Sequence, residues 1–286
     1  MKKVLLLSSL AVSGVILAGC GSGGSTGGVT LDTLLEESNK VMNSVKSVST
    51  NINIDVEMDM SASTGGNDTS LEIKMTGEGV LEAVLDNFAA HQVMKMNVNL
   101  YNVDQASSTE TYMIADANNS KKVDVYTNSV SNDAESGWSH TSMDMEDASQ
   151  NLNLNLYNLY TNSKDSFSLE KKTKQFEGSE CYVVNAKLGF KDIASYVGES
   201  LSQLNVDENS DLKIDTVYYI DKETKEVKGA EVDMADTMKS LLEESAQQSS
   251  NTGIKINIKA FKVTSENTYN TVTSIDIPKE VTEAAN

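Results

Sequence analysis

The chain has few side chains whose type and spacing suit catalysis. Its two histidines, His91 and His140, belong neither to an H-E-x-x-H motif nor to another close metal-ligand spacing. His91 lies in a stretch of alternating polarity, and His140 follows shortly after Trp138. We therefore predict structural or surface roles for both histidines, and we expect neither a metal site nor a cofactor.

Two further patterns imitate known motifs without their context. Residues 23–27 read G-G-S-T-G, which matches the G-x-S-x-G string of hydrolases, but no strand precedes the string and no apolar helix follows it directly. Residues 207–211 begin like a calcium-binding loop, but Leu212 replaces the required glycine and Tyr218 replaces the bidentate glutamate. Most other carboxylates alternate with apolar residues, as on a solvated face. We therefore expect that the chain is not an enzyme.

The chain has two cysteines, Cys20 and Cys181. Cys181 lies in the alternating stretch SECYVVNAKL, which predicts that its thiol packs in or beside a strand. A reactive thiol is the alternative. If processing consumes Cys20, Cys181 has no partner within the chain for a disulfide.

Residues 1–19 have the layout of a secretory signal peptide. Lys2 and Lys3 are followed by an apolar run from Val4, and small residues precede Cys20. Serines and a glycine interrupt the run, which is short for a permanent membrane span of about 20 apolar residues. We predict that this leader is removed.

The end of the leader is more specific. Leu17, Ala18, Gly19 and Cys20 resemble the lipobox of bacterial lipoproteins at all four positions. The resemblance implies a diacylglyceryl thioether on Cys20 and cleavage before it, with Leu17 to Gly19 recognised by the processing enzyme. Two acyl chains give the stable anchoring that one does not. Residues 20–28 would then be the lipidated cysteine and a Gly/Ser-rich tether of roughly 16 Å, and an ordinary secreted leader is the alternative.

The charge of the chain limits its partners. The formal net charge is −19, and removal of the leader's two lysines makes it more negative still. No basic cluster offsets this charge locally, so nucleic acids and anionic headgroups would be repelled. We expect a membrane attachment through the lipid anchor and no nucleic-acid partner, while the sequence does not indicate a protein partner.

Hydrophobic periodicity predicts the elements of the body. Residues 31–48 keep helical spacing after an N-cap at Thr30. NINIDVEMDM at 51–60 alternates with period two, as expected for a strand with one solvated face in an antiparallel sheet. The segment 146–163 fits either a strand or a helix, and we favour a short helix. Two more helices are expected at 190–204 and 234–245.

The remaining stretches read as antiparallel strands. Alternation at 71–75 and 88–100, shorter strands near 112–115 and 123–126, and another around Trp138 precede three hairpins. The hairpins lie at 166–188, 215–234 and 253–278, and we expect Pro278 to close the last strand. We therefore predict an α+β fold of roughly ten antiparallel strands with three or four helices, forming one domain over residues 29–286.

Several stretches resemble the LolA/LppX-like superfamily of bacterial lipoproteins, and most of all its uncharacterised Gram-positive members. They are LLEESNKVMNSVKSVSTNINIDVEMDM, FEGSECYVVNAKL, YYIDKETKEVKGAEVDM and IDIPKEVTEAA. The resemblance implies a curved, incomplete antiparallel β-barrel with helices packed on its concave face. In relatives that concavity holds acyl chains. It also implies a location on the outer face of the cell membrane of a Gram-positive bacterium.

An adaptable apolar lining would suit such a ligand, because methionine adjusts to varied shapes. The expected ligand-lining residues lie on apolar strand faces and are Ile54, Val56, Met58, Met60, Met75, Met94 and Met96. We therefore expect a membrane-anchored, non-enzymatic lipoprotein that binds a lipid or another apolar ligand. The alternative is a cell-surface interaction or sensory lipoprotein in which the same methionines fill a solid core.

Overall fold

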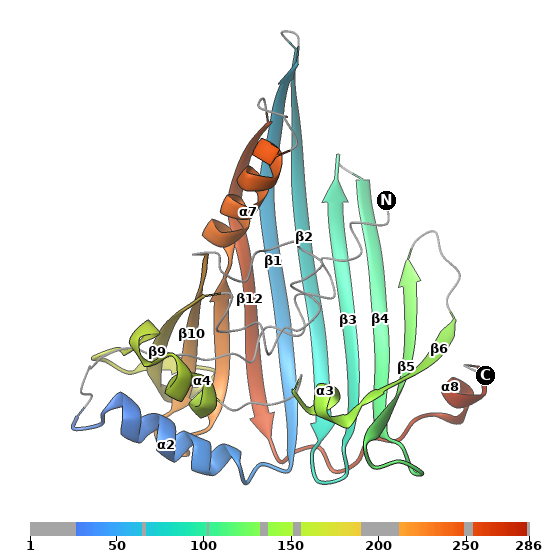
Figure 1. Ribbon diagram of the computed structural model, residues 1–286, viewed down its shortest axis with the longest axis vertical. Helices are drawn as coiled ribbons and strands as arrows, with labels where there is room; N and C mark the ends of the chain where they lie inside the picture. Colours follow the sequence, from blue (N-terminus) through green and yellow to red (C-terminus); the bar gives the residue numbers. More distant parts are fainter. Residues whose placement is uncertain are drawn as a thin grey trace.

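One antiparallel sheet of twelve strands dominates the computed structural model (Figure 1), which describes residues 27–64, 67–101, 103–131, 137–150, 156–189, 212–248 and 254–284. The strand order is β6-β5-β4-β3-β2-β1-β12-β11-β10-β9-β7, and β8 pairs with β9. The end strands β6 and β7 do not pair, so the sheet is curved and unclosed. The predicted α+β fold with an incomplete, curved antiparallel sheet is confirmed.

The strands differ greatly in length. They are β1 (Ser47–Thr64), β2 (Asn67–Val84), β3 (Ala89–Leu100), β4 (Val103–Ala115), β5 (Lys122–Ser131), β6 (Trp138–Asp144), β7 (Phe167–Leu169), β8 (Lys174–Phe176), β9 (Ser179–Gly189), β10 (Lys213–Asp221), β11 (Val227–Asp233) and β12 (Ile254–Tyr269). The helices are α2 (Leu31–Met42), α3 (Met145–Gln150), α4 (Leu156–Asn162), α7 (Ala235–Gln248) and α8 (Lys279–Ala284), with a 3-10 turn η1 (Lys164–Ser166).

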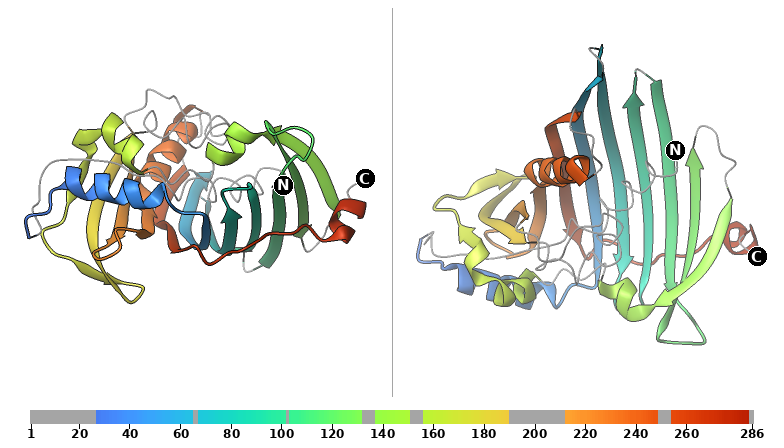
Figure 2. Two further views of the ribbon diagram at one scale, coloured as in Figure 1. Left: turned by 90° about the horizontal axis from the view of Figure 1, so that it is seen from below. Right: turned by 45° about the horizontal axis from the view of Figure 1, so that its top comes forward.

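The two sides of the sheet are covered differently. Helices α3, α4 and α7 lie on the same side, which we call the inner face, while the segment from 271 to 278 runs along the opposite, outer face to α8 (Figure 2). The largest core cluster joins the inner face of β1–β3 and β9–β12 to side chains of α2, α4 and α7. Helix α8 contacts β6 instead.

Helix α2 begins where the sequence predicted and ends earlier. The side chains of Thr30 and Thr33 form a reciprocal capping box, which satisfies free backbone N–H groups of the first turn. The helical spacing extends to Val48 in the sequence, but the helix ends at Met42 and Val48 lies in β1. Val45 and Val48 continue the three-residue spacing of the helix because both are buried in a second core cluster with Phe88, although neither belongs to the helix.

The alternating strand predicted at 51–60 is confirmed. Ile52, Ile54 and Val56 are at most 3% exposed, whereas Asn51 and Asp55 between them are exposed. This regular alternation gives β1 its two faces, and pairing with β2 on one side and β12 on the other fixes its register.

The predicted C-terminal hairpin is wrong. Residues 254–269 form the single long strand β12, because β1 pairs along one edge and β11 occupies part of the other. Asn270, with a φ of 58°, follows the end of the strand. Pro278 does not close a strand but precedes α8, where its carbonyl accepts the N–H of Val281 at 3.0 Å.

The other predicted elements mostly agree with the structure. The ambiguous segment contains the short helices α3 and α4, and the hairpins around 177–178 and 222–226 are present. Strands β4 and β5 are longer than expected. The helix predicted at 190–204 lies outside the described residues, as do Leu17, Ala18, Gly19 and Cys20.

Candidate functional site

The expected ligand-lining residues come together on the inner face. Ile54, Val56, Met58, Met75, Met94 and Met96 are all at most 8% exposed and belong to one core cluster, and Met60 is partly buried toward the free end of β1. The register places Ile54 of β1 opposite Gly77 of β2, and Gly77 opposite Met96 of β3. The predicted residues therefore form one continuous apolar surface across three strands.

Methionine side chains close over glycines in the middle of this surface. A Cβ added to Gly79 would lie 2.6 Å from Cε of Met94, and one added to Gly77 would lie 2.5 Å from Sδ of Met96. Both glycines belong to β2, and both methionines belong to the paired strand β3. Flexible thioether side chains thus occupy the space that larger residues on β2 would fill.

The surface continues onto residues that were not in the predicted set. Phe261 and Val263 of β12 and Val232 of β11 face the same cluster at 3–6% exposure. The alternation of KINIKAFKV at 255–263 carries this signal in the sequence. The predicted lining was therefore incomplete on the side of β12, where α7 packs.

The helices α2 and α4 are joined at the edge of the inner face. Tyr160 of α4 donates a hydrogen bond to Asp32 in the first turn of α2, and Nζ of Lys164 lies 2.7 Å from the same carboxylate. The Lys164 ammonium also stands 4.7 Å from the ring centroid of Tyr160. The ion pair is exposed and adds little, so the two helices are held together mainly by their side chains in the large core cluster.

Two hydroxyls interrupt the apolar surface. Tyr218 of β10 and Ser38 of α2 are 2% and 1% exposed, and neither side-chain oxygen has a hydrogen-bond partner. Burial raises the pKa of Tyr218 far above its usual range, so it stays neutral, although Thr216 two residues earlier acts in the opposite direction. Unpaired buried hydroxyls cost about 1–3 kcal/mol each, and they are the polar groups of this face that a ligand could satisfy.

Beside Met94 and Met96, the apolar character of the inner face ends between β3 and β4. Met94 and Met96 of β3 pair with Thr109 and Ser107 of β4. Thr109 in turn pairs with Ser129 of β5, and their hydroxyl oxygens are 3.3 Å apart. This part of the inner face on β4–β6 is therefore lined by hydroxyl groups, whereas near the start of β5 the inner face is apolar again through Met113 and Val123.

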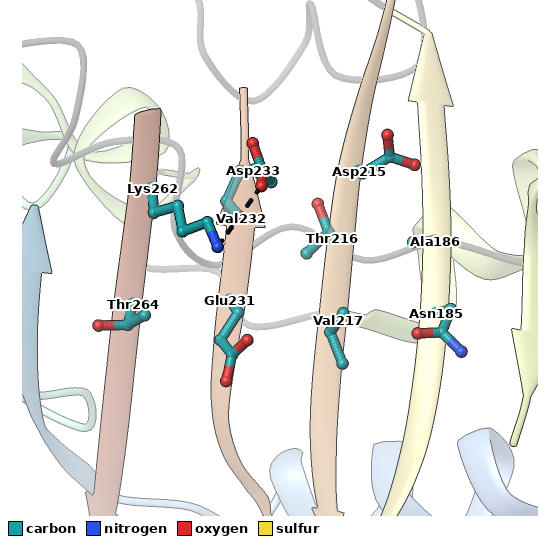
Figure 3. A pocket seen from close by; sticks show the side chains of 10 residues that line it. All are labelled: Asn185, Ala186, Asp215, Thr216, Val217, Glu231, Val232, Asp233, Lys262 and Thr264. Carbon is teal, nitrogen blue, oxygen red and sulfur yellow. Dashed lines mark ion pairs between the residues drawn. The ribbon is translucent and has the colours of Figure 1, made fainter. Parts of the chain in front are cut away.

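A polar groove lies on the outer face of β9–β12 (Figure 3). Its volume is about 210 Å³, and its lining includes Asp215, Val217, Glu231 and Lys262. Lys262 is 3.9 Å from Asp233, and Glu231 accepts the hydroxyl of Tyr219 at 2.9 Å. The groove is on the opposite side of the sheet from the predicted lining residues and does not belong to that surface.

Cys181 packs beside its strand, as predicted. It is fully buried on the outer face of β9 with Val183 and Tyr219, and the ring of Phe176 stacks on Tyr219 at 4.1 Å. Burial, followed by the negative charge of Asp221, raises the pKa of the Cys181 thiol to about 11. The thiol is therefore protonated near neutral pH, which disfavours the alternative of a reactive cysteine.

Among the described residues, no group of three or more His, Cys, Asp or Glu side chains is placed to hold a metal ion. In the same part of the chain, no helix has both the length and the apolar character needed to cross a membrane. The residues of the predicted lipid attachment are outside this part of the chain.

The chain has a family match and remote structural neighbours. A model described as a family of unknown function, DUF6612, matches residues 30–286. No curated protein matches the chain at a significant level.

The structural neighbours are weakly similar. LprF from Mycobacterium bovis is 9% identical at a TM-score of 0.40, covering 86% of this chain and 96% of its own. A β-barrel-like protein of the family of unknown function DUF1849 from Brucella abortus is 9% identical at a TM-score of 0.29, and the match covers 79% of this chain and 99% of that protein. A candidate outer membrane lipoprotein-sorting domain from Vibrio parahaemolyticus is 7% identical at a TM-score of 0.22, and the match covers 87% of this chain and 95% of that domain. At these values the likeness carries no conclusion about function.

Proposed function

This chain belongs to the family of unknown function DUF6612, and we propose that it is a non-enzymatic lipoprotein that binds a lipid or another apolar ligand. Cys20 would carry the lipid anchor on the outer face of a Gram-positive cell membrane. The ligand would lie on the inner face of the sheet, against β1–β3 and β9–β12.

One observation carries this proposal: the largest apolar cluster of the inner face is a single surface that joins β1–β3 to β9–β12. Ile54, Met75 and Met94 belong to it, whereas the register partners of Met94 and Met96 on β4 are the hydroxyl residues Thr109 and Ser107. A surface lined by methionines can repack around an acyl chain, because the thioether side chain has three rotatable bonds and a polarisable sulfur. The unpaired hydroxyls of Ser38 and Tyr218 would give a ligand two polar contacts.

Native mass spectrometry after gentle purification tests the proposed ligand. We expect apolar molecules to copurify with the chain, and the delipidated protein to take up a fluorescent fatty acid. The substitution Met96→Lys should abolish uptake because it places a charge on the apolar surface, while Asn97→Lys, the exposed neighbour on the other face, should leave uptake unchanged. Circular dichroism establishes that both variants are folded. A ligand-free protein that also fails to take up the probe would refute the proposal.

The lipid anchor needs a separate test. Cys20→Ala should release the protein from membrane fractions, because the thioether cannot form. Cys181→Ala is the matched control and should leave the protein in the membrane fraction, since that thiol is buried within the body. Membrane association that survives Cys20→Ala would contradict the anchor and leave the ligand proposal standing.

The second candidate function is a cell-surface interaction lipoprotein with a solid interior. It is favoured by the close fit of Met94 and Met96 over Gly79 and Gly77, because side chains that fill such space leave less of it for a ligand. Crosslinking in cells distinguishes the two candidates. Capture of one protein partner by a ligand-free chain would support the second, and the absence of any crosslinked partner would count against it.

A further inference from the structure

Four rings form a row across the outer face at the other end of the sheet. The register places His91 of β3, Tyr112 of β4, Tyr126 of β5 and His140 of β6 opposite one another in sequence. His91 stacks on Tyr112 with ring centroids 4.3 Å apart, and His140 stacks on Tyr126 at 4.6 Å. Both histidines of the protein therefore belong to one surface.

The only tryptophan of the chain completes this surface. Trp138 begins β6, and its ring is 5.8 Å from that of Tyr112. We call these five residues the aromatic row. The rings of Trp138 and Tyr126 are partly exposed, and that of His140 is exposed.

Two carboxylates lie among these rings, and each has a histidine partner, while Glu110 also accepts the hydroxyl of Tyr112 at 3.1 Å. Nε2 of His91 is 2.9 Å from Oε1 of Glu110, and Nε2 of His140 is 2.9 Å from Oδ1 of Asp124. Within the described part of the chain, neither carboxylate forms an ion pair with a lysine. Unlike lysine, histidine carries no permanent positive charge, so neither carboxylate has a permanent cationic partner among these residues.

Two further groups add acceptor capacity and negative charge. Asn128 lies between Glu110 and Trp138 in the register, and its buried Oδ1 has no hydrogen-bond partner. Glu280 of α8 is close enough for its charge to contribute to the raised pKa of Tyr112. That pKa reaches about 12, mainly through burial and then through Glu110. The surface thus combines aromatic rings, two carboxylates without a lysine partner and a buried amide oxygen without a hydrogen-bond partner.

We propose that the aromatic row, together with Glu110, Asp124 and Asn128, binds a small organic cation that carries N–H donors, such as an alkylammonium group. The partly exposed rings of Trp138 and Tyr126 attract a cation. The carboxylates and the amide oxygen accept its N–H groups, and a hydrogen bond between charged partners is about twice as strong as a neutral one. The net charge of −19 favours a cation and opposes phosphates and other anions.

Ring stacking alone does not account for this surface. The His–Tyr pairs would stabilise the strands by about 0.5–1.5 kcal/mol each without any ligand. That role requires neither two carboxylates without lysine partners nor a buried amide oxygen without a donor. Both features are explained if a cation with N–H donors occupies the surface.

Fluorescence titration tests the proposal, because Trp138 is the only tryptophan and reports on this surface alone. The probes are n-butylammonium and tetramethylammonium, which have the same charge, with sodium chloride at matched ionic strength as the blank. We expect a saturable change with butylammonium and clearly weaker binding of tetramethylammonium, which has no N–H donor. Isothermal titration calorimetry gives a second readout.

The double substitution Glu110→Gln/Asp124→Asn should weaken butylammonium binding by about tenfold or more, because it removes both charges and keeps the side-chain shapes. Asp215→Asn removes a carboxylate from the other half of the outer face, where Lys187 pairs with it at 3.0 Å, and should have no effect. Circular dichroism checks folding. Equal binding by the double variant and the wild type, equal binding of the two cations, or no saturable signal in either readout would overturn the proposal.

Discussion

The two halves of the sheet differ in the side chains that they place on the two faces. On β1–β3 and β9–β12 the inner face is apolar, and along β1 the outer face is polar, as the neighbours Ile54 and Asp55 illustrate. On β4–β6 the middle of the inner face carries hydroxyl groups, while the aromatic row lies on the outer face, as the neighbours Thr111 and Tyr112 illustrate. The change occurs between two hydrogen-bonded strands, β3 and β4.

The inner face therefore has two parts of different polarity. The first half buries its apolar residues against helices α2, α4 and α7, where we propose the apolar ligand. The second half has a smaller core at its lower end, formed by Val123, Phe88 and their neighbours, and leaves the rest of its inner face polar. The methionine-lined part of the inner face therefore has a boundary between Met94 and Met96 of β3 and their hydroxyl partners on β4.

The largest expected effect comes from placing a charge on each side of that boundary. Met94 and Thr109 are register partners on the same face. Met94→Asp should lower the free energy of unfolding by about 4 kcal/mol or more, because it buries an unpaired carboxylate. Thr109→Asp should lower it by less than about 1 kcal/mol, because the site is partly solvated. Urea denaturation measures both, and similar losses would contradict the boundary.

A smaller effect tests the reversed polarity of β4. Tyr112→Ala should lower the free energy of unfolding by about 2–4 kcal/mol, because the ring is 9% exposed and contacts His91 and Trp138. Thr111→Ala on the inner face should cost less than about 1 kcal/mol. Thermal unfolding of the two variants measures both losses of stability. A larger loss of stability for Thr111→Ala than for Tyr112→Ala would contradict the account, because it would mean that β4 buries its inner face at this position.

The smallest effect concerns the fit of methionine over glycine. Gly79→Ala should cost about 1 kcal/mol, because the new Cβ displaces the flexible end of Met94 and lies 3.1 Å from the carbonyl oxygen of Val93. Combining it with Met94→Ala should give a loss smaller than the sum of the two single losses, since the displaced group is absent. Strict additivity in the denaturation cycle would show that Met94 does not occupy this space.

Much of the first half could be predicted from the sequence, because its strands alternate cleanly. Ile52, Ile54 and Val56 define an apolar face with charged or amide residues between them, and the structure buries that face. The glycines at 77 and 79 break the alternation of β2, and only the pairing of β2 with β3 shows that methionines cover them.

The second half was harder to predict, because both of its faces are of mixed polarity. The stretch VDQASSTETYMIA has no regular alternation, so the sequence indicated only a short strand near 112–115, whereas β4 spans thirteen residues. The aromatic row brings together residues up to 49 positions apart, from His91 to His140, through strand register. The single-sequence pattern assigned each histidine a structural or surface role and could not place the two together.

Photocrosslinking with a diazirine-bearing fatty acid tests the central claim most directly. The probe is bound to the delipidated protein, irradiated, and located by peptide mass spectrometry. The account predicts labels on peptides from β1–β3 and β12 that contain Val56, Met75, Met94 or Phe261, and few labels on β4–β6. Labels mainly on β4–β6 or on the outer face, or no saturable labelling, would contradict an apolar ligand site on the inner face.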